Sequence, residues 1–298
     1  MRVVQLILLF LSLCLSAELQ YEGPLPPQID TISLKKEYRR IHALVNPAQP
    51  VDSAPVIIRF YSRSDERILG VRLPEWGGGG AIGKDTIIVP VDRNYAFFNT
   101  DFQRIAIHEL VHIVLVRSYG ILRVPRWFHE GLAMALSGEL SFDGSVILSR
   151  AILTGSLLHL DSIERLNRFD HWKAQLSYCQ SHFAVSFLID TYGYDLLPEL
   201  LSATKHRRNF EAASLEVFGL STKEFEKLLQ TEIQKRYKYL FLISDYSLFW
   251  VGGALLLIAG FIVTRIRNRS KSKQMEIQEE IERRQEIENM ESENREEV

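Results

Sequence analysis

The sequence predicts an α+β domain followed by one transmembrane helix. Two short apolar segments with the character of strands, Val56–Tyr61 and Thr86–Val91, precede a region whose pattern is largely helical from Asp101 to Tyr239. Strands first and helices afterwards favour an α+β arrangement over an alternating α/β fold. A third observation, the uncharged stretch from Ser247 to Thr264, adds the membrane helix.

The composition is that of a folded protein, and it argues against two classes. Of the 298 residues, 46% are hydrophobic, which is too apolar for a disordered chain. The formal net charge of -2 lacks the strong basic excess of a nucleic-acid-binding protein. We therefore expect no nucleic-acid partner.

Residues 1–17 have the pattern of a secretory signal peptide. Arg2 precedes an apolar run from Val3 to Leu15, which is too short to span a bilayer comfortably. Two small residues follow, although Leu15 occupies a position where a small residue is preferred for cleavage after Ala17. Cleavage is the favoured outcome, and an uncleaved signal anchor is the alternative.

Residues 246–264 are predicted to form a single transmembrane helix. The stretch begins with Tyr246, Phe249 and Trp250, as membrane-interface segments often do. Residues 265–273 then carry five basic residues and no acidic ones. A basic flank marks the cytoplasmic side, so the region from residue 18 to about 245 is expected outside the cytoplasm.

Residues 265–298 are predicted to be a basic stop followed by a Glu-rich cytoplasmic tail. Residues 274–298 contain ten Glu and three Arg, a pattern typical of a solvated segment, with a protein partner as the alternative. Cys179 is the only cysteine between residues 18 and 245, and that region has no Asn-x-Ser/Thr sequon. Both features favour a single-pass protein of the bacterial inner membrane with a periplasmic domain.

Residues 18–50 are expected to be a Pro-containing spacer and a helix that lead to the main domain, residues 51–240. The helical spacing runs from Leu34 to Val45. Four consecutive glycines, Gly77–Gly80, precede the second strand. Because no GxxxxGK[ST] pattern is present, we interpret them as a loop or hairpin rather than a phosphate site.

The segment Arg104–Val114 contains the motif HELVH. His108 and His112 are four positions apart, so both imidazoles project from one side of a helix and can bind one metal ion. Glu109 projects toward the same side and can serve as general base for a water activated by the metal. Neutral imidazoles suit Zn²⁺, and three protein ligands leave one position open. An ordinary buried helix is the alternative, although burying these polar groups without partners is costly.

A second segment, Pro125–Ala133, is expected to supply the third ligand. Pro125 suits a helix start, and small residues at Gly131, Ala133 and Ala135 allow another helix to approach closely. Glu130 and His129 are both chemically competent ligands. Adjacent helical positions differ by about 100°, so only one of them can face the metal.

The pairing of HELVH with PRWFHEGLA resembles the gluzincin metalloproteases, especially the peptidase-MA-like families with the motif W-[FL]-x-E-G-[LF]-A. The resemblance covers roughly residues 55–240. It implies a zincin-like domain with a small N-terminal mixed sheet, an active-site helix and a helical C-terminal part. It also implies Zn²⁺ bound by His108, His112 and Glu130, with Glu109 as general base and acid.

Other segments extend the resemblance. The stretch GGGGAIGKDTIIVPV is similar to the strand that borders the cleft and pairs with extended substrate in such enzymes, and Tyr178–Ser181 is similar to their Y-x-Q-S helix. Tyr178 is therefore a candidate oxyanion stabiliser, with simple packing as the alternative. Two positions depart from the pattern: His129 stands where Asn is frequent, and Met134 where a carboxylate is frequent.

These features predict a membrane-anchored zinc metallopeptidase that acts on a peptide or protein substrate. Cys179 has no matching His/Asn motif and is expected to be a small buried residue rather than a nucleophile. Two alternatives remain from the sequence. One is a catalytically silent envelope interaction or sensor module of the same fold, and the other is a zinc amidase that acts on cell-wall material.

Overall fold

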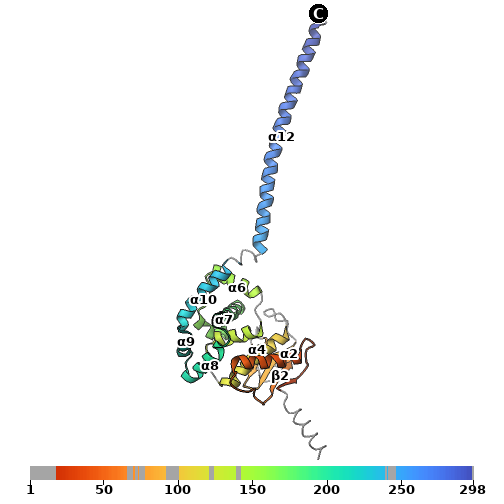
Figure 1. The fold of residues 1–298 in the computed structure, drawn as a ribbon. Coiled ribbons are helices and arrows are strands. Elements are labelled where there is room, and N and C mark those ends of the chain that lie inside the picture. Colours follow the sequence, from red (N-terminus) through yellow and green to blue (C-terminus); the bar gives the residue numbers. More distant parts are fainter. Residues whose placement is uncertain are drawn as a thin grey trace, which may run out of the picture. The chain divides into compact units, whose positions relative to one another are not determined.

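A computed structural model describes residues 18–65, 70, 73, 78–91, 101–120, 124–138, 142–238, 240 and 246–296. The predicted signal peptide lies outside these residues. The chain divides into two units, Met1–Phe241 and Leu242–Val298. In the first unit helix α2 (Thr31–Val45) and strand β2 (Val56–Tyr61) lie toward one side, and helices α6 (Phe142–Leu153), α7 (His171–Tyr192) and α10 (Thr222–Tyr237) lie toward the other (Figure 1).

Four strands form a mixed sheet in the described part of the first unit. Its strands are β1 (Leu19–Glu22), β2 (Val56–Tyr61), β3 (Gly80–Ile82) and β4 (Thr86–Pro90), in the spatial order β1-β2-β4-β3. The pairs β1/β2 and β2/β4 are parallel, and β3 runs antiparallel to β4. The α+β fold with a small mixed sheet, predicted from the sequence, is confirmed.

Residues 18–50, predicted as a spacer and helix ahead of the main domain, contribute to the sheet and to the core. β1 pairs with β2 from Leu19 opposite Val56 onwards. Helix α2 spans Thr31–Val45, and it begins three residues before the expected Leu34 because the Asp30 side chain accepts hydrogen bonds from the first backbone N–H groups. The described residues of this segment thus pack within the same unit as the residues that follow.

Helix α4 (Phe102–Tyr119) carries the HELVH motif through the core. Every residue from Ile105 to Leu115 is buried. Asp101 caps its first turn by accepting a hydrogen bond from the N–H of Arg104, and Gly120 ends it. The expected start at Asp101 and turn at Tyr119–Gly120 are thus confirmed.

Arg117 anchors the C-terminal end of α4 to the sheet. Its guanidinium donates to the backbone carbonyls of Lys84, Ala54 and Pro55 at 2.7–2.9 Å, and it forms an ion pair with Asp85 at 2.8 Å. The Arg117 side chain is only 5% exposed. These bonds join the helix to the turns that precede β2 and β4, which sets the position of the motif relative to the sheet.

Helix α5 (Arg126–Ser137) packs against α7 (His171–Tyr192), and the two backbones meet at Gly131. A Cβ atom at Gly131 would lie 2.2 Å from the carbonyl oxygen of Ser181 and 2.7 Å from a methyl group of Val185. The close approach predicted from Gly131 is therefore confirmed. Only glycine leaves room for this contact.

An aromatic cluster holds the start of α5 against the C-terminal helices. The Trp127 ring stacks on Phe225 at a centroid distance of 5.5 Å and meets Phe210 edge-on at 5.8 Å. Phe128 also contacts Phe210. The remaining elements of this unit are η1 (Arg63–Asp65), α6 (Phe142–Leu153), η2 (Leu160–Arg168), α8 (Leu196–Arg207), α9 (Phe210–Phe218) and α10 (Thr222–Tyr237).

The second unit contains α12 (Tyr246–Glu296), a single uninterrupted helix. Within the described residues one helix is long and apolar enough to cross a membrane, and its candidate span begins at Trp250. The stretch predicted as a transmembrane helix, residues 246–264, lies at the start of α12. The basic segment and the Glu-rich segment as far as Glu296 continue the same helix.

The contact at Gly131 generates a stability prediction. In an open helix alanine is more stable than glycine by about 0.8–1.0 kcal/mol. Because the new methyl group would overlap the Ser181 carbonyl, we expect Gly131→Ala to destabilise the protein instead, by about 1–3 kcal/mol. The measurement is the thermal unfolding midpoint of the full chain in detergent, which should fall by about 2–4 °C per kcal/mol.

A suitable control is Gln234→Ala, at an exposed position of α10. It should change stability by less than about 0.5 kcal/mol. An unfolding midpoint for Gly131→Ala equal to or above that of the wild type would contradict the packing described.

Candidate metal centre

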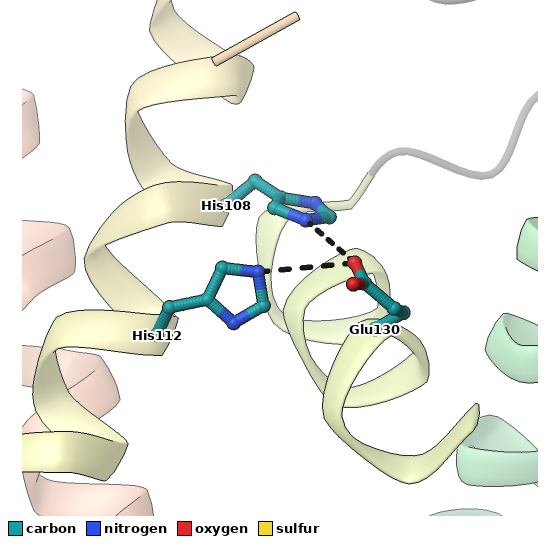
Figure 2. Close-up of side chains that lie close together, drawn as sticks. All are labelled: His108, His112 and Glu130. Carbon is teal, nitrogen blue, oxygen red and sulfur yellow. Dashed lines mark ion pairs between the residues drawn. The ribbon is translucent and has the colours of Figure 1, made fainter. Parts of the chain in front are cut away.

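Three side chains from two helices converge at the centre of the first unit. The Nε2 atoms of His108 and His112 lie 3.5 Å and 3.8 Å from the same carboxylate oxygen, Oε2 of Glu130. Figure 2 shows the two imidazoles projecting from α4 toward the carboxylate on α5. Their ligand atoms all lie within 4.8 Å of one another. Each of the three residues is only 7–9% exposed.

The geometry and chemistry of this group fit a metal ion. Two ligand atoms at about 2.0–2.2 Å from a tetrahedral metal are separated by about 3.3–3.6 Å, close to the two distances observed. Two imidazoles and one carboxylate are also a common donor set of catalytic zinc sites. Among the described residues this is the one group of three or more His, Cys, Asp or Glu side chains with such convergence.

Arg126 contacts the other oxygen of the Glu130 carboxylate. Its Nη2 lies 3.2 Å from Oε1, one helical turn before Glu130 on α5. The backbone N–H of Arg126 donates to Glu164 at 2.7 Å, which caps the start of the helix. Arg126 therefore occupies Oε1 and leaves Oε2 directed at the two histidines.

The surroundings of the site keep the carboxyl group of Glu130 ionised and the imidazole of His112 neutral. Burial raises the pKa of Glu130, but the hydrogen bond from His108 and the charge of the neighbouring Arg126 outweigh it, so that this pKa lies well below its usual range. Burial, together with His129 and His108, lowers the pKa of His112 well below its usual value. Metal binding requires deprotonated ligands, and both groups are already in that state near neutral pH.

His129, the rival for the third ligand, lies beside the group rather than within it. Its ring stacks on that of His112, with centroids 4.3 Å apart and planes 4° apart. His108 meets His112 edge-on, at 4.9 Å and 78°. The converging set of ligand atoms contains Glu130 and not His129.

Glu109, the predicted general base, lies beside the glycine-rich segment that leads into β3. A Cβ atom at Gly79 would be 3.1 Å from Oε1 of Glu109 and 3.0 Å from the side chain of Ile105. The Glu109 side chain is buried, on the same helix as both histidines. A side chain at position 79 would therefore press on the carboxylate.

Helix α7 contains Tyr178 and the rest of the Y-x-Q-S segment. Tyr178 is half-buried and lies three residues before Ser181, whose carbonyl contacts Gly131. The Gln180 amide accepts a hydrogen bond from the Leu158 N–H at 2.8 Å and donates to the Leu158 carbonyl at 3.0 Å. This pair ties α7 to the segment before η2, which is a structural role for the motif glutamine.

Cys179 is buried beside these residues. Burial raises the pKa of its thiol to about 12, so the sulfur stays protonated and is a poor nucleophile. The expectation of a small buried residue agrees with its 6% exposure.

The contacts of Arg126 and Gly79 were not predicted from the sequence. Arg126 stands four residues before Glu130, a spacing that permits an ion pair on a helix and was the available signal. The contact of Gly79 joins residues thirty positions apart, and no local pattern indicates it.

A buried His-Glu-x-x-His helix that packs on a mixed sheet, with a glutamate from the next helix, defines a metallopeptidase-like domain. The chain belongs to the Peptidase MA superfamily, whose family model matches residues 41–235. The predicted resemblance to a peptidase-MA-like family is thereby confirmed. Proteins of this family are typically metal-dependent, and the group His108, His112 and Glu130 can hold the ion.

The chain is also similar to the "Uncharacterized protein YhcO" of Bacillus subtilis (strain 168), with 27% identity over 143 residues. The match covers 45% of this chain and 42% of that protein, so the chain spans less than half of the relative's length. No solved structure matches the chain significantly.

If Glu130 is the carboxylate ligand, its replacement should abolish stable metal binding. We expect the wild-type protein to hold one zinc ion, and Glu130→Gln to lose more than about 100-fold in zinc affinity, since even an outer partner of a metal ligand contributes about 10–100-fold. Elemental analysis and competition with a chelator measure the two quantities. Glu216→Gln, an exposed glutamate that pairs with Arg207, is the matched control. Full zinc retention in Glu130→Gln would rule out this ligand assignment.

Proposed function

We propose that this protein is a membrane-anchored zinc metallopeptidase that hydrolyses peptide bonds outside the cytoplasm. The observation that carries the proposal is the convergence of His108, His112 and Glu130 in a Peptidase MA chain whose HExxH glutamate, Glu109, lies on the same buried helix. The metal ligands and the general base are then the residues predicted from the sequence.

The ligand set would hold Zn²⁺ by the Nε2 atoms of the two histidines and Oε2 of Glu130. When bound, the ion supplies a Lewis acid that polarises the scissile carbonyl and makes a water molecule more acidic. Arg126, on the far oxygen of Glu130, restrains the carboxylate so that a single oxygen faces the histidines. Three protein ligands would leave the bound ion accessible to water and substrate.

Glu109 would act first as a base and then as an acid. Its carboxylate accepts a proton from the attacking water as the oxygen of that water forms a bond to the carbonyl carbon. The protonated carboxyl then delivers the same proton to the amine nitrogen, and the carbon–nitrogen bond breaks. The products are a carboxylic acid and an amine, and Glu109 returns to its starting state.

The substrate would bind along β3 as an additional strand. The sheet order ends at β3, so the outer backbone groups of this strand are available in the described part of the sheet. Gly79, directly before β3, lies against the Glu109 carboxylate. An extended peptide hydrogen-bonded to β3 would therefore pass beside the general base.

Tyr178 is the proposed donor to the developing oxyanion. Its helix contacts α5 at Gly131, one residue after the ligand Glu130. A hydroxyl on this helix would stabilise negative charge on the carbonyl oxygen by donating a hydrogen bond. In the proposed mechanism Tyr178 therefore stabilises the oxyanion, and Glu109 transfers the proton.

The membrane arrangement follows from α12. The apolar start of the helix would cross the inner membrane once, and the basic residues 265–273 would lie on the cytoplasmic side. The Glu-rich remainder would then be exposed to cytoplasmic protein partners. The signal peptide over residues 1–17 would direct the catalytic domain to the opposite side.

The role of Glu109 is tested by Glu109→Gln. We expect this variant to bind zinc as the wild type does but to cleave a mixed peptide library about 10²–10⁴-fold more slowly, because the amide cannot accept the proton. Product formation is followed by mass spectrometry, and zinc content is measured on the same samples. Glu216→Gln should cleave as the wild type does.

Equal cleavage by the wild type and Glu109→Gln would sink the peptidase mechanism. A wild type that binds zinc but cleaves no peptide would favour the silent interaction module. Release of amine from cell-wall fragments alone would favour an amidase.

The proposed topology predicts opposite labelling of two cysteine variants. On a Cys14→Ser background, a membrane-impermeant maleimide should label Glu199→Cys in intact spheroplasts, since position 199 is exposed on α8. Ser272→Cys, which follows the proposed span, should be labelled only after the membrane is broken. The buried Cys179 gives the background signal. Labelling of Ser272→Cys in intact spheroplasts would contradict the orientation.

A further inference from the structure

Within the described residues, the side chain of His112 lacks the partner that a metal-ligating histidine usually has. Such residues almost always donate their second ring N–H to a carboxylate, a carbonyl or a water, which fixes the orientation of the ring. In the described part of the chain, Nδ1 of His112 is buried and has no hydrogen-bond partner. Met134, four residues after Glu130 on α5, is buried and apolar and cannot supply such a partner.

The ring of His112 is instead confined by two other rings. His129 covers one face in a parallel stack, with centroids 4.3 Å apart. His108 approaches edge-on at 78°. Because His129 directly precedes Glu130 on α5, the helix that supplies the third ligand also touches the second.

The stacked arrangement is incompatible with His129 as a ligand of the same ion. A metal bound by Nε2 of His112 lies in the plane of that imidazole. The plane of the His129 ring is parallel to it within 4° and displaced from it, and the lone pairs of a ring nitrogen point within its own plane. In this geometry His129 contacts the ligand and not the metal.

We propose that His129 is a positioning residue, whose ring holds the imidazole of His112 in the orientation that directs Nε2 at the metal. Ring stacking thereby replaces the hydrogen bond that His112 would otherwise make through Nδ1. This inference rests on the proposed zinc site. It assigns to position 129, one of the two departures from the family pattern, a role in metal affinity.

The role predicts that an aromatic ring, and not a ring nitrogen, is required at position 129. Offset stacking of two rings has a modest energy, so its loss should weaken metal binding by about 3–10-fold. Phenylalanine retains the stack, whereas leucine and alanine do not. His159→Leu, at a side chain that is 83% exposed, serves as the matched control.

The experiment titrates the metal-free full chain in detergent with Co²⁺ and measures Zn²⁺ affinity by competition with a chelator. We expect His129→Leu and His129→Ala to bind both ions about 3–10-fold more weakly and to alter the visible absorption bands of bound Co²⁺. His129→Phe and His159→Leu should stay within about twofold of the wild type and retain its spectrum. The unfolding midpoint of each metal-free variant shows whether that variant folds as the wild type does. Metal affinity is then compared in whichever of the leucine and alanine variants keeps the wild-type midpoint.

Two results would overturn the proposal. Wild-type affinity and an unchanged Co²⁺ spectrum in a folded leucine or alanine variant would show that the stack does not position His112. A loss in His129→Phe as large as that in His129→Leu would show that the ring nitrogen is needed. A wild type that binds neither ion contradicts the zinc site itself, which separates the failure of the proposed function from the failure of this inference.

Discussion

The contact between Gly131 and the Ser181 carbonyl determines where Glu130, the proposed third ligand, can lie. Helix α5 approaches α7 so closely that no side chain fits between them, and this contact fixes both the depth and the rotation of α5. Trp127 and Phe128 secure the same helix from its first turn through rings on α9 and α10. With α5 fixed in this way, Glu130 faces α4. A rotation of one residue, about 100°, would present a different side chain to the histidines.

The polar groups of the centre are buried in a helix that is otherwise apolar, and burial of unpaired polar groups is costly. In this structure, side chains on both α4 and α5 provide partners for these buried polar groups. The Glu130 carboxylate is divided between Arg126 on one oxygen and the two histidines on the other. Arg117, at the end of α4, satisfies carbonyls of the sheet turns, so the helix cannot shift along its axis without breaking several hydrogen bonds. Rigid placement of this kind is what a metal centre requires, because ligand positions must hold to within a few tenths of an ångström.

Features encoded by local periodicity could be predicted from the sequence, and features created by contacts between distant segments could not. The bounds Val56–Tyr61 and the start of a helix at Asp101 follow from residue patterns within one turn or strand. The separation of His108 and His112 by one helical turn follows in the same way. β1 escaped prediction because four residues beside a Pro-rich stretch acquire strand character only by pairing with β2. The stacking of His129 on His112 depends on the rotation of α5 relative to α4. A short stretch of sequence does not determine how two helices are rotated relative to each other.

The uninterrupted course of α12 has an electrostatic consequence for the tail. A helix of 51 residues is about 77 Å long, of which a bilayer core takes about 30 Å. If the span ends near residue 264, the first basic residues lie within the Debye length of about 8 Å from the headgroups, where anionic lipids attract them. Glu276 and the acidic residues beyond it lie more than about 15 Å along the rod, outside that range. In the proposed topology the helix would therefore act as a spacer that holds its negative end beyond the range of repulsion by anionic lipids, where it would be accessible to a basic partner.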